Sequence, residues 1–408
     1  MPVFEKGRNI MKFSSKAKKC GLSPMRKFYP FAFAAEQAGK KIYSLNLGQP
    51  DVETPPQFFE AVRKFEQPVL GYAPSGGLLV LNDAIRGYYD KLNMHFEQDE
   101  VLITAGGSEA LQIVFNCILD DGDEIIIPEP YYPNYTTMAI ATGASVRAIP
   151  TTPEEGYHYA DRAKIESLIN ENTRAILCTS PGNPTGCVLT REEMRMIVDI
   201  AKEHDLFLLA DEAYREFTYE SDELLSFGEF EDAAENVVIL DTVSKRFSAC
   251  GARIGCIISH NKELMGECMK FCQARISVST LDQIAAAALY DVGPDYFTNV
   301  REEYKRRRDT VVSKLEKIPG VICSCPKGAF YVMAALPVDS ADSFQEWMLK
   351  EFDDNGETVI CSPAGPMYAT PGKGINEIRI AYVLKQEDLE RAMDILALGI
   401  EAYNKRGK

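Results

Sequence analysis

The middle of the chain alternates short apolar runs with helical patterns, and this alternation limits the fold more than any other feature. The apolar runs are bounded by turn residues and predict strands at residues 101–104, 124–127, 175–179, 206–210, 237–240 and 255–259. Amphipathic patterns at 109–117 and 191–204 lie between some of these runs. Continuous apolar strands joined by helices are typical of a mostly parallel sheet that is covered on both faces. We therefore expect an α/β fold.

A second unit is expected after the sheet pattern. A long charged helix is predicted over residues 296–318, and its charges are those of a solvated helix that joins two domains. Alternating segments at 329–334, 358–361 and 377–381 predict the strands of a smaller α+β domain. We expect an N-terminal arm and part of the small domain at 1–47, a large ligand-binding domain at 48–293 and a small C-terminal domain at 294–408.

The charge balance excludes one class of partner. The 408 residues include 44 Lys and Arg against 60 Asp and Glu, a net charge of −16. Such a field repels a phosphate backbone, so we expect no nucleic-acid partner. A basic run from Lys6 to Lys27 opposes this balance, and we expect it to be an arm that packs on a partner subunit.

Location and metal content follow from what the sequence contains. No window approaches eighteen apolar residues and the N-terminus has no apolar core, so we expect no membrane span and no signal peptide. The eleven cysteines are an odd number without a framework, which favours reduced thiols and a cytoplasmic protein. The four histidines have no metal-ligand spacing, and no metal site is predicted.

Two glycine-containing segments resemble catalytic motifs but do not complete them. Residues 106–110 read Gly-Gly-Ser-Glu-Ala, which is close to a serine nucleophile elbow, but Ala110 replaces its second glycine. No Gly-x-Gly-x-x-Gly follows a strand, and Gly372-Lys373-Gly374 lacks the spacing of a phosphate loop. Serine hydrolysis and hydride transfer on a dinucleotide are therefore not supported.

Polar residues follow three of the predicted strands, and a sheet of this kind binds ligands at the carboxyl ends of its strands. Asn183 follows strand 175–179, Asp211 and Tyr214 follow strand 206–210, and Lys245 and Arg253 follow strand 237–240. Each has an ordinary explanation alone, such as a helix cap, a turn or a surface charge. Together they predict a carboxylate, an amide, a phenol, a lysine and an arginine around one crevice.

Pyridoxal phosphate is the cofactor whose chemistry needs this set. Lys245 supplies the amine for a Schiff base, and Asp211 keeps the ring nitrogen protonated so that the ring accepts electrons. Asn183 and Tyr214 are predicted donors to the ring oxygen.

The remaining cofactor contacts concern the phosphate and the ring face. A hydroxyl, an arginine fork and backbone N–H groups at a helix start bind phosphate, and an aromatic ring stacks on the cofactor. The residues predicted for these contacts are Thr242, Ser244, Arg253, Gly107, Ser108 and Glu109 for the phosphate, and Tyr132 for the ring.

The ordered set of motifs resembles the class I/II aminotransferases, pyridoxal-phosphate enzymes of the type I, aspartate aminotransferase-like fold. The resemblance runs from about residue 43 to residue 382. It is carried by Asn-Pro-Thr-Gly at 183–186, Asp-Glu-Ala-Tyr at 211–214, Ser-Lys at 244–245 and Gly-Ala-Arg-Ile-Gly at 251–255. Segments 47–51, 71–77 and 378–381 also match.

The resemblance implies roles for further residues. Lys245 would be the Schiff-base lysine and the general acid/base of the proton shift. Arg379 would bind the substrate α-carboxylate with help from the Gly48 backbone. Tyr72 would reach the phosphate of the neighbouring subunit, which implies a homodimer with shared active sites. A cis peptide bond is predicted between Asn183 and Pro184.

The implied reaction moves an amino group from an L-amino acid to a 2-oxo acid, with aspartate and glutamate among the candidate substrates. Relatives that bind a distal carboxylate use either a lysine after strand 101–104, which is absent here, or an arginine from the partner subunit. Arg275, in an Arg-x-x-x-Ser stretch, matches the second arrangement, and an ordinary helix-end charge explains it equally well. The alternatives are a β-lyase or a cyclopropane-forming synthase on the same fold, and a non-catalytic regulatory protein.

Overall fold

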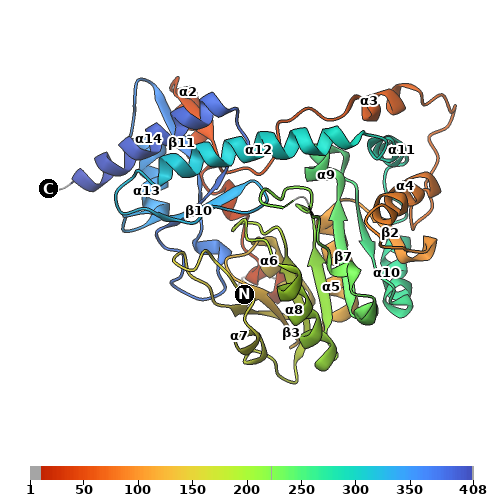
Figure 1. The fold of residues 1–408 in the computed structure, drawn as a ribbon. Helices are drawn as coiled ribbons and strands as arrows, with labels where there is room; N and C mark the ends of the chain where they lie inside the picture. The colour runs from red at the N-terminus through yellow and green to blue at the C-terminus, as the bar shows by residue number, and fades with distance from the viewer. Residues whose placement is uncertain (1–10, 222, 407–408) are drawn as a thin grey trace, which may run out of the picture.

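The computed structural model describes residues 11–221 and 223–406, and its largest element is a seven-stranded sheet (Figure 1). In spatial order the strands are β2 (Val101–Thr104), β8 (Gly255–Ile258), β7 (Val237–Thr242), β6 (Phe207–Asp211), β5 (Thr173–Thr179), β3 (Glu124–Pro128) and β4 (Ser145–Ile149). All neighbouring strands from β7 to β4 are parallel, whereas β8 runs antiparallel to both of its neighbours, β2 and β7. The predicted α/β sheet is therefore confirmed.

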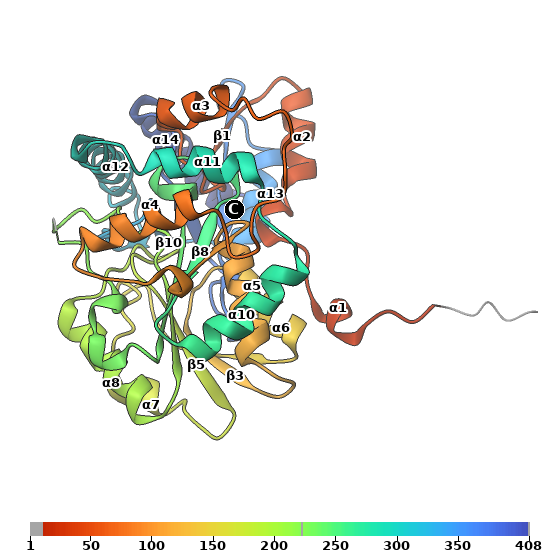
Figure 2. The same ribbon diagram turned by 90° about the vertical axis from the view of Figure 1, so that its right-hand side faces the viewer.

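Helices cover both faces of this sheet, and Figure 2 shows several of them beside it. The alternation within β3 explains both layers, because Ile125 and Ile127 pack into one core and Ile126 into the other. One face is covered by α5 (Gly107–Ile118), α6 (Asn134–Thr142) and α10 (Lys262–Ala274). The other is covered by α4 (Leu79–Asp90), α7 (Arg162–Glu166), α8 (Arg191–Glu203) and α11 (Thr280–Leu289).

Two smaller sheets form the second unit. The four-stranded sheet has the order β12 (Ser362–Pro363), β13 (Glu377–Ala381), β10 (Tyr331–Ala335) and β9 (Ile322–Cys323), and all its pairs are antiparallel. The other pairs β1 (Lys41–Ser44) in parallel with β11 (Glu357–Ile360). They pack with α2 (Tyr29–Gln37), α13 (Ala341–Lys350) and α14 (Gln386–Lys405).

The predicted long helix is α12 (Pro294–Leu315), which runs between the two units in Figure 1. It is only partly solvated, because Tyr304, Val311 and Leu315 are buried in the core of the second unit. The helix α3 (Pro56–Arg63) packs on α11, and α9 (Val243–Arg246) directly follows β7. Residues after β5, β6 and β7 share a cavity with Tyr331 and Arg379 of the second unit, so the two units meet at the carboxyl ends of these strands.

The basic arm was expected to pack on a partner subunit, and its residues 6–10 lie outside the described part of the chain. The rest of it forms α1 (Ser15–Lys19), which contacts α6 of the same chain. Lys16 Nζ donates to Thr142 O at 2.7 Å and pairs with Asp121 at 2.7 Å. Among the described helices, none combines the length and the apolar character that crossing a bilayer requires.

Candidate active site

A cavity of about 280 Å³ opens at the carboxyl ends of β5, β6 and β7, where the two units meet. Its wall contains most of the side chains that the sequence predicts for the site. They are Gly48, Gly107, Ser108, Tyr132, Asn183, Asp211, Tyr214, Thr242, Ser244, Lys245, Arg253 and Arg379. The fold therefore brings together residues that are up to 331 positions apart in the chain, from Gly48 to Arg379.

Lys245 reaches the cavity from the short helix α9, directly after β7. Thr242 caps this helix, because its side chain accepts a hydrogen bond from Ser244 N at 3.1 Å. The Lys245 Nζ donates to Gly48 O at 2.7 Å and lies 3.8 Å from the Cys250 sulfur. The amine is thus held at the cavity wall by a backbone carbonyl and is close to a thiol.

Asp211 lies at the end of β6, with its carboxylate in the cavity wall. The Tyr135 hydroxyl donates to Oδ2 at 2.6 Å, and Ala213 N donates to Oδ1 at 3.2 Å. Burial raises the pKa of the Asp211 carboxyl above its usual value, although these two hydrogen bonds oppose the rise. In residues 11–221 and 223–406 no ion pair joins this carboxylate to a basic side chain, so a cation in the cavity would find an acceptor here.

Arg379 enters the cavity from the opposite side, on β13 of the smaller unit, and is 1% exposed. Its Nη1 donates to Asn183 Oδ1 at 3.0 Å and its Nη2 donates to Asn46 O at 2.7 Å. The guanidinium also lies 4.5 Å from the centre of the Tyr331 ring, whose hydroxyl is 2.8 Å from that of Tyr214. These contacts fix a buried cation beside the amide and the phenol that the sequence predicts for the ring oxygen.

The start of α5 forms one end of the cavity. Gly107 and Ser108 are its first residues. The N–H groups in the first turn of a helix have no hydrogen-bond acceptor within the helix, because no turn precedes them. Arg253 lies above the preceding Gly106, where an added Cβ would be 2.4 Å from Nη2. Its Nη1 and Nη2 donate to Cys250 O and Ala105 O, each at 3.1 Å. A guanidinium and a helix N-terminus thus meet at this end of the cavity.

Two hydroxyls complete the same end. Thr242 Oγ1 lies 2.8 Å from Ile254 O and 2.8 Å from Ser244 Oγ. Both side chains are more than nine-tenths buried and both belong to the cavity wall. Hydroxyls, a guanidinium and helix N–H groups are together the donor set that binds a phosphate.

Three of the predicted residues lie outside this cavity wall. Glu109 Oε2 accepts from Ala105 N at 2.6 Å, and its Oε1 lies 3.4 Å from Arg275 Nε. Arg275 ends α10 and donates to carbonyls of its own chain. Tyr72 is 85% exposed on the loop between α3 and α4.

The cavity also contains residues that the sequence did not single out. Tyr135 binds Asp211 and is 1% exposed, and Tyr331 bridges Tyr214 and Arg379. Cys250 and Leu47 line the wall beside Lys245 and Gly48. Tyr135 lies three residues after Tyr132, and residues at this spacing share a face at a helix start. This spacing could have indicated Tyr135 as a site residue. Tyr331 offered no such signal, because it lies in a strand buried along its whole length.

The peptide bond between Asn183 and Pro184 is cis, as the sequence predicts. The bonds before Pro130 and Pro181 are cis as well, and these were not predicted.

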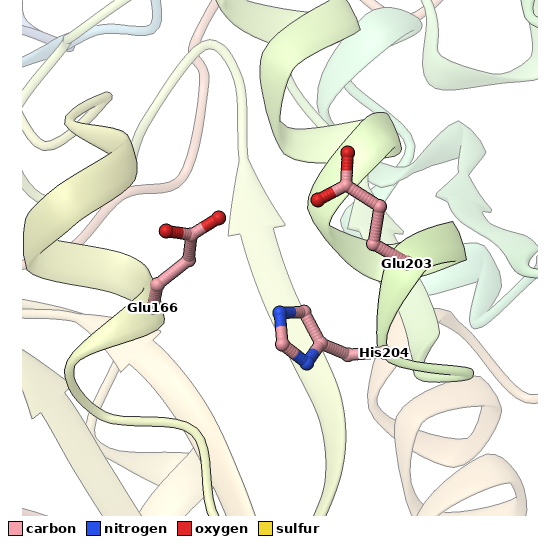
Figure 3. A group of neighbouring side chains, drawn as sticks. All are labelled: Glu166, Glu203 and His204. Carbon is pink, nitrogen blue, oxygen red and sulfur yellow. The ribbon is translucent and has the colours of Figure 1, made fainter.

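One group of possible metal ligands occurs in the described part of the chain, away from the cavity (Figure 3). It consists of Glu166, Glu203 and His204. Arg162 Nη1 already binds both glutamates, at 2.6 and 2.8 Å. Its guanidinium neutralises the carboxylates that a metal ion would need, so this group carries no metal assignment.

The residues of the cavity fit pyridoxal phosphate on chemical grounds. The wall combines Asp211, a carboxylate that forms no ion pair within the described residues, with an end built from phosphate donors. The Lys245 amine and the Arg379 guanidinium belong to the same wall. A ring with a basic nitrogen, a carbonyl and a phosphate would meet a complementary group at each position.

Comparison with known proteins agrees with this assignment. The family model for aminotransferase class I and II matches residues 40–396. The aspartate aminotransferase of Pyrococcus horikoshii is 31% identical over 90% of this chain and 93% of its own. The aromatic-amino-acid aminotransferase 2 of Thermococcus litoralis is 30% identical over 94% of this chain and 97% of its own.

Solved structures show the same fold. The alanine aminotransferase from Pyrococcus furiosus superposes with a TM-score of 0.87 at 28% sequence identity, over 96% of this chain and 100% of the other. The type I fold predicted from the motifs is therefore confirmed. The chain belongs to the class I and II aminotransferases, which transfer amino groups between amino acids and 2-oxo acids with pyridoxal 5′-phosphate.

Proposed function

We propose that this aminotransferase works as a homodimer on L-amino acids with uncharged side chains, with Lys245 as the lysine that binds the cofactor. The observation that carries the proposal is the arrangement of Lys245, Asp211 and Arg379 around one cavity. These three side chains come from α9, β6 and β13. Each provides a charge or a nucleophile, and the reaction needs each of these groups for a different purpose.

The proposed roles follow from the contacts. Bound pyridoxal phosphate supplies a carbonyl that links to an amine and a ring that withdraws electrons from the substrate α-carbon. Asp211 holds a positive charge at the ring nitrogen, and Asn183 and Tyr214 donate to the ring oxygen. Arg379 binds the α-carboxylate, because its guanidinium is already aimed by Asn183 and Asn46. Tyr132 covers the ring face.

Lys245 moves the proton of the reaction. Its amine lies 2.7 Å from Gly48 O, so the carbonyl holds the group in the cavity when it is not bound to the cofactor. From this position the amine would accept the α-proton of a substrate whose carboxylate Arg379 holds, and would act as the acid that gives it back. Gly48 tolerates no side chain here, because an added Cβ would lie 1.7 Å from the Tyr331 hydroxyl.

The substrate class rests on the basic groups around the cavity. Within the described residues, the arginines and lysines of its wall are Lys245, Arg253 and Arg379, and each has a role in the scheme above. Arg275, the candidate for a distal carboxylate, is bound to Glu109 and to carbonyls of its own chain. This favours a substrate with an uncharged side chain. An acidic substrate is the second candidate, because three of the relatives are named aspartate aminotransferases.

The proposed dimer rests on the loop that carries Tyr72. Exposed apolar side chains gather at this loop and at the start of α4, namely Val69, Leu70, Tyr72, Leu79 and Val80, each between 53% and 85% exposed. A second copy of the chain would cover this surface and receive Tyr72 at its cofactor phosphate. The cytoplasmic location is supported by the eleven cysteines, all of which are free thiols.

A half-reaction screen tests the proposed function. Each amino acid is added to the protein loaded with pyridoxal phosphate, without a 2-oxo acid, and the cofactor absorbance is followed. Alanine and phenylalanine are expected to convert the cofactor to its amine form with larger kcat/KM than aspartate or glutamate, and with one 2-oxo acid formed per cofactor. Net ammonia release would identify a β-lyase, and conversion by aspartate and glutamate alone would favour the second candidate.

A further inference from the structure

The loop that carries Tyr72 is fixed to its own subunit on both sides of that residue. Before it, Gly71 O accepts from Thr280 Oγ1 on α11 at 2.7 Å. After it, Gly76 O accepts from Ile103 N on β2 at 2.9 Å. Gly77 has a φ of +116° and leaves no room for a side chain, because an added Cβ would lie 2.1 Å from the Ile103 side chain. Between these contacts the Tyr72 side chain is 85% exposed and extends away from the subunit.

Arg275 also contacts this loop. It ends helix α10, and its Nη2 donates to Ser75 O at 3.3 Å and to Ile103 O at 3.1 Å. The first acceptor belongs to the Tyr72 loop and the second to β2, so one guanidinium nitrogen holds the loop against the strand. Its side chain is 18% exposed, which keeps these bonds largely out of water.

Glu109 extends the same contact to the phosphate end of the cavity. Its Oε1 lies 3.4 Å from Arg275 Nε, and its Oε2 accepts from Ala105 N at 2.6 Å. Ala105 precedes Gly106 and the first helical residues Gly107 and Ser108, and Ala105 O also accepts from Arg253. Glu109 therefore binds the segment whose backbone forms one end of the cavity.

We infer that the Arg275–Glu109 pair positions two phosphate-binding elements at once, the α5 N-terminus of its own active site and the Tyr72 loop that serves the neighbouring one. This inference rests on the proposed function, in which Tyr72 crosses to the partner. It makes Arg275 a positioning residue and not a reader of the substrate's distal carboxylate. A change at Arg275 then weakens phosphate binding in both sites of the dimer, whatever the amino acid.

The first test measures cofactor affinity of the apoprotein rather than turnover. Arg275→Gln and Glu109→Gln are each expected to weaken binding of pyridoxal phosphate by about tenfold, as for the loss of one hydrogen bond to a charged group. Binding of pyridoxal, which has no phosphate, is expected to stay within about twofold, because the pair acts through the phosphate. Arg147→Gln is the matched control, since Arg147 forms a comparable pair with Glu124 at 3.2 Å on the edge strand β4.

Mixed dimers separate the two elements. One subunit carries Lys245→Ala, so borohydride traps cofactor only in the site of the other. When Arg275→Gln is added to the Lys245→Ala subunit, the trapping site keeps its own α5 N-terminus and receives Tyr72 from an altered loop. When Arg275→Gln is placed in the other subunit, Tyr72 is unaltered and the α5 end changes. The inference predicts weaker trapping in both dimers.

The outcomes distinguish this inference from the proposed function. The role of the pair in both sites is overturned if trapping is weaker in neither mixed dimer or in only one. It is also overturned if pyridoxal binding is lost to the same extent as pyridoxal phosphate binding. A loss of kcat/KM confined to aspartate and glutamate also overturns it and assigns Arg275 to the substrate. Tyr72→Phe in the Lys245→Ala subunit tests whether Tyr72 reaches the neighbouring site. If this change weakens trapping and Arg275→Gln does not, only the positioning role of Arg275 is refuted. No effect of Tyr72→Phe refutes the crossing, and with it the inference.

Discussion

The guanidinium of Arg379 donates a 3.0 Å hydrogen bond to the side-chain oxygen of Asn183, and so joins strand β13 of the smaller unit to the loop after β5 of the large sheet. Asn183 uses its oxygen in this bond, which leaves its Nδ2 for the hydrogen bond proposed to the cofactor. One amide thus connects the group proposed to hold the substrate with the group proposed to hold the ring. The geometry of the substrate relative to the cofactor depends on this pair.

Arg379→Lys tests the fork that this bond aims. A lysine keeps the charge but lacks the planar fork that donates to Asn183 and Asn46 and still presents N–H groups to a carboxylate. We expect kcat/KM for every amino acid to fall roughly a hundredfold, a loss of about 3 kcal/mol in transition-state binding. Steady-state kinetics measure the loss, and the cofactor absorbance should not change. Arg391→Lys, at a surface pair with Asp354 and Glu357, is the control. A loss below threefold would remove Arg379 from the substrate site.

Asp211→Asn separates catalysis from stability. Without a charge at the ring nitrogen, the activation free energy is expected to rise by about 4 kcal/mol or more, so kcat falls by several orders of magnitude. A loss below tenfold would mean that another group holds the ring nitrogen. Stopped-flow measurement of the half-reaction gives the rate of the chemical step directly.

The same substitution has an opposite effect on the protein without cofactor. The pKa of Asp211 is raised in the folded state, so ionising it opposes folding at neutral pH and the penalty disappears as the pH falls below that pKa. The cofactor-free Asp211→Asn protein is expected to melt at a higher temperature than the unsubstituted protein at pH 7, with the difference shrinking in acid. Equal melting temperatures at every pH would contradict the raised pKa.

A buried charge network behind Lys245 is expected to determine stability in acid. Asp241 Oδ2 binds Arg246 at 2.6 Å and Arg215 at 3.3 Å, and each of these side chains is about 1–2% exposed. Burial alone would raise the pKa of Asp241, but the two guanidinium groups hold it below its usual value. A lowered pKa contributes stability above the carboxyl's ordinary pKa, and this stability is lost as the pH falls through the folded-state value.

Asp241→Asn tests the network. The variant leaves two buried arginines with one carboxylate fewer, and we expect the free energy of unfolding at pH 7 to fall by about 3–5 kcal/mol. Asp121→Asn, which breaks an exposed pair with Lys16, is expected to cost less than about 1 kcal/mol. Urea unfolding measures both. Equal effects of the two changes would mean that the buried network contributes no more than a surface pair.

The sequence predicted the parts of the fold that buried apolar runs determine. Strands β3, β5, β6 and β7 lie where those runs occur, because the central residues of a strand covered on both faces are apolar. Edge strand β4 was missed, because Arg147 and its half-exposed neighbours interrupt the pattern. The antiparallel direction of β8 was not predicted either, since apolar content carries no information on strand direction.

The site was predictable where its residues follow strands and not where they come from elsewhere. Asn183, Asp211 and Lys245 line the cavity because strand ends converge at one edge of the sheet. Tyr331 begins a fully buried strand of the other unit, and its contact with Tyr214 exists only because the two units meet. The contacts of Arg275 lie within the large unit, but they too join segments far apart in the chain, since β2 and the Tyr72 loop approach it only in the folded protein.

Borohydride reduction followed by peptide mapping tests the central claim most directly. The account predicts that the purified protein is yellow and that reduction removes its Schiff-base absorbance. The reduced cofactor should be attached to Lys245, and the Lys245→Ala protein should show no such attachment and almost no turnover. Attachment to any other lysine, or a protein that forms no reducible bond with pyridoxal phosphate, would contradict the account.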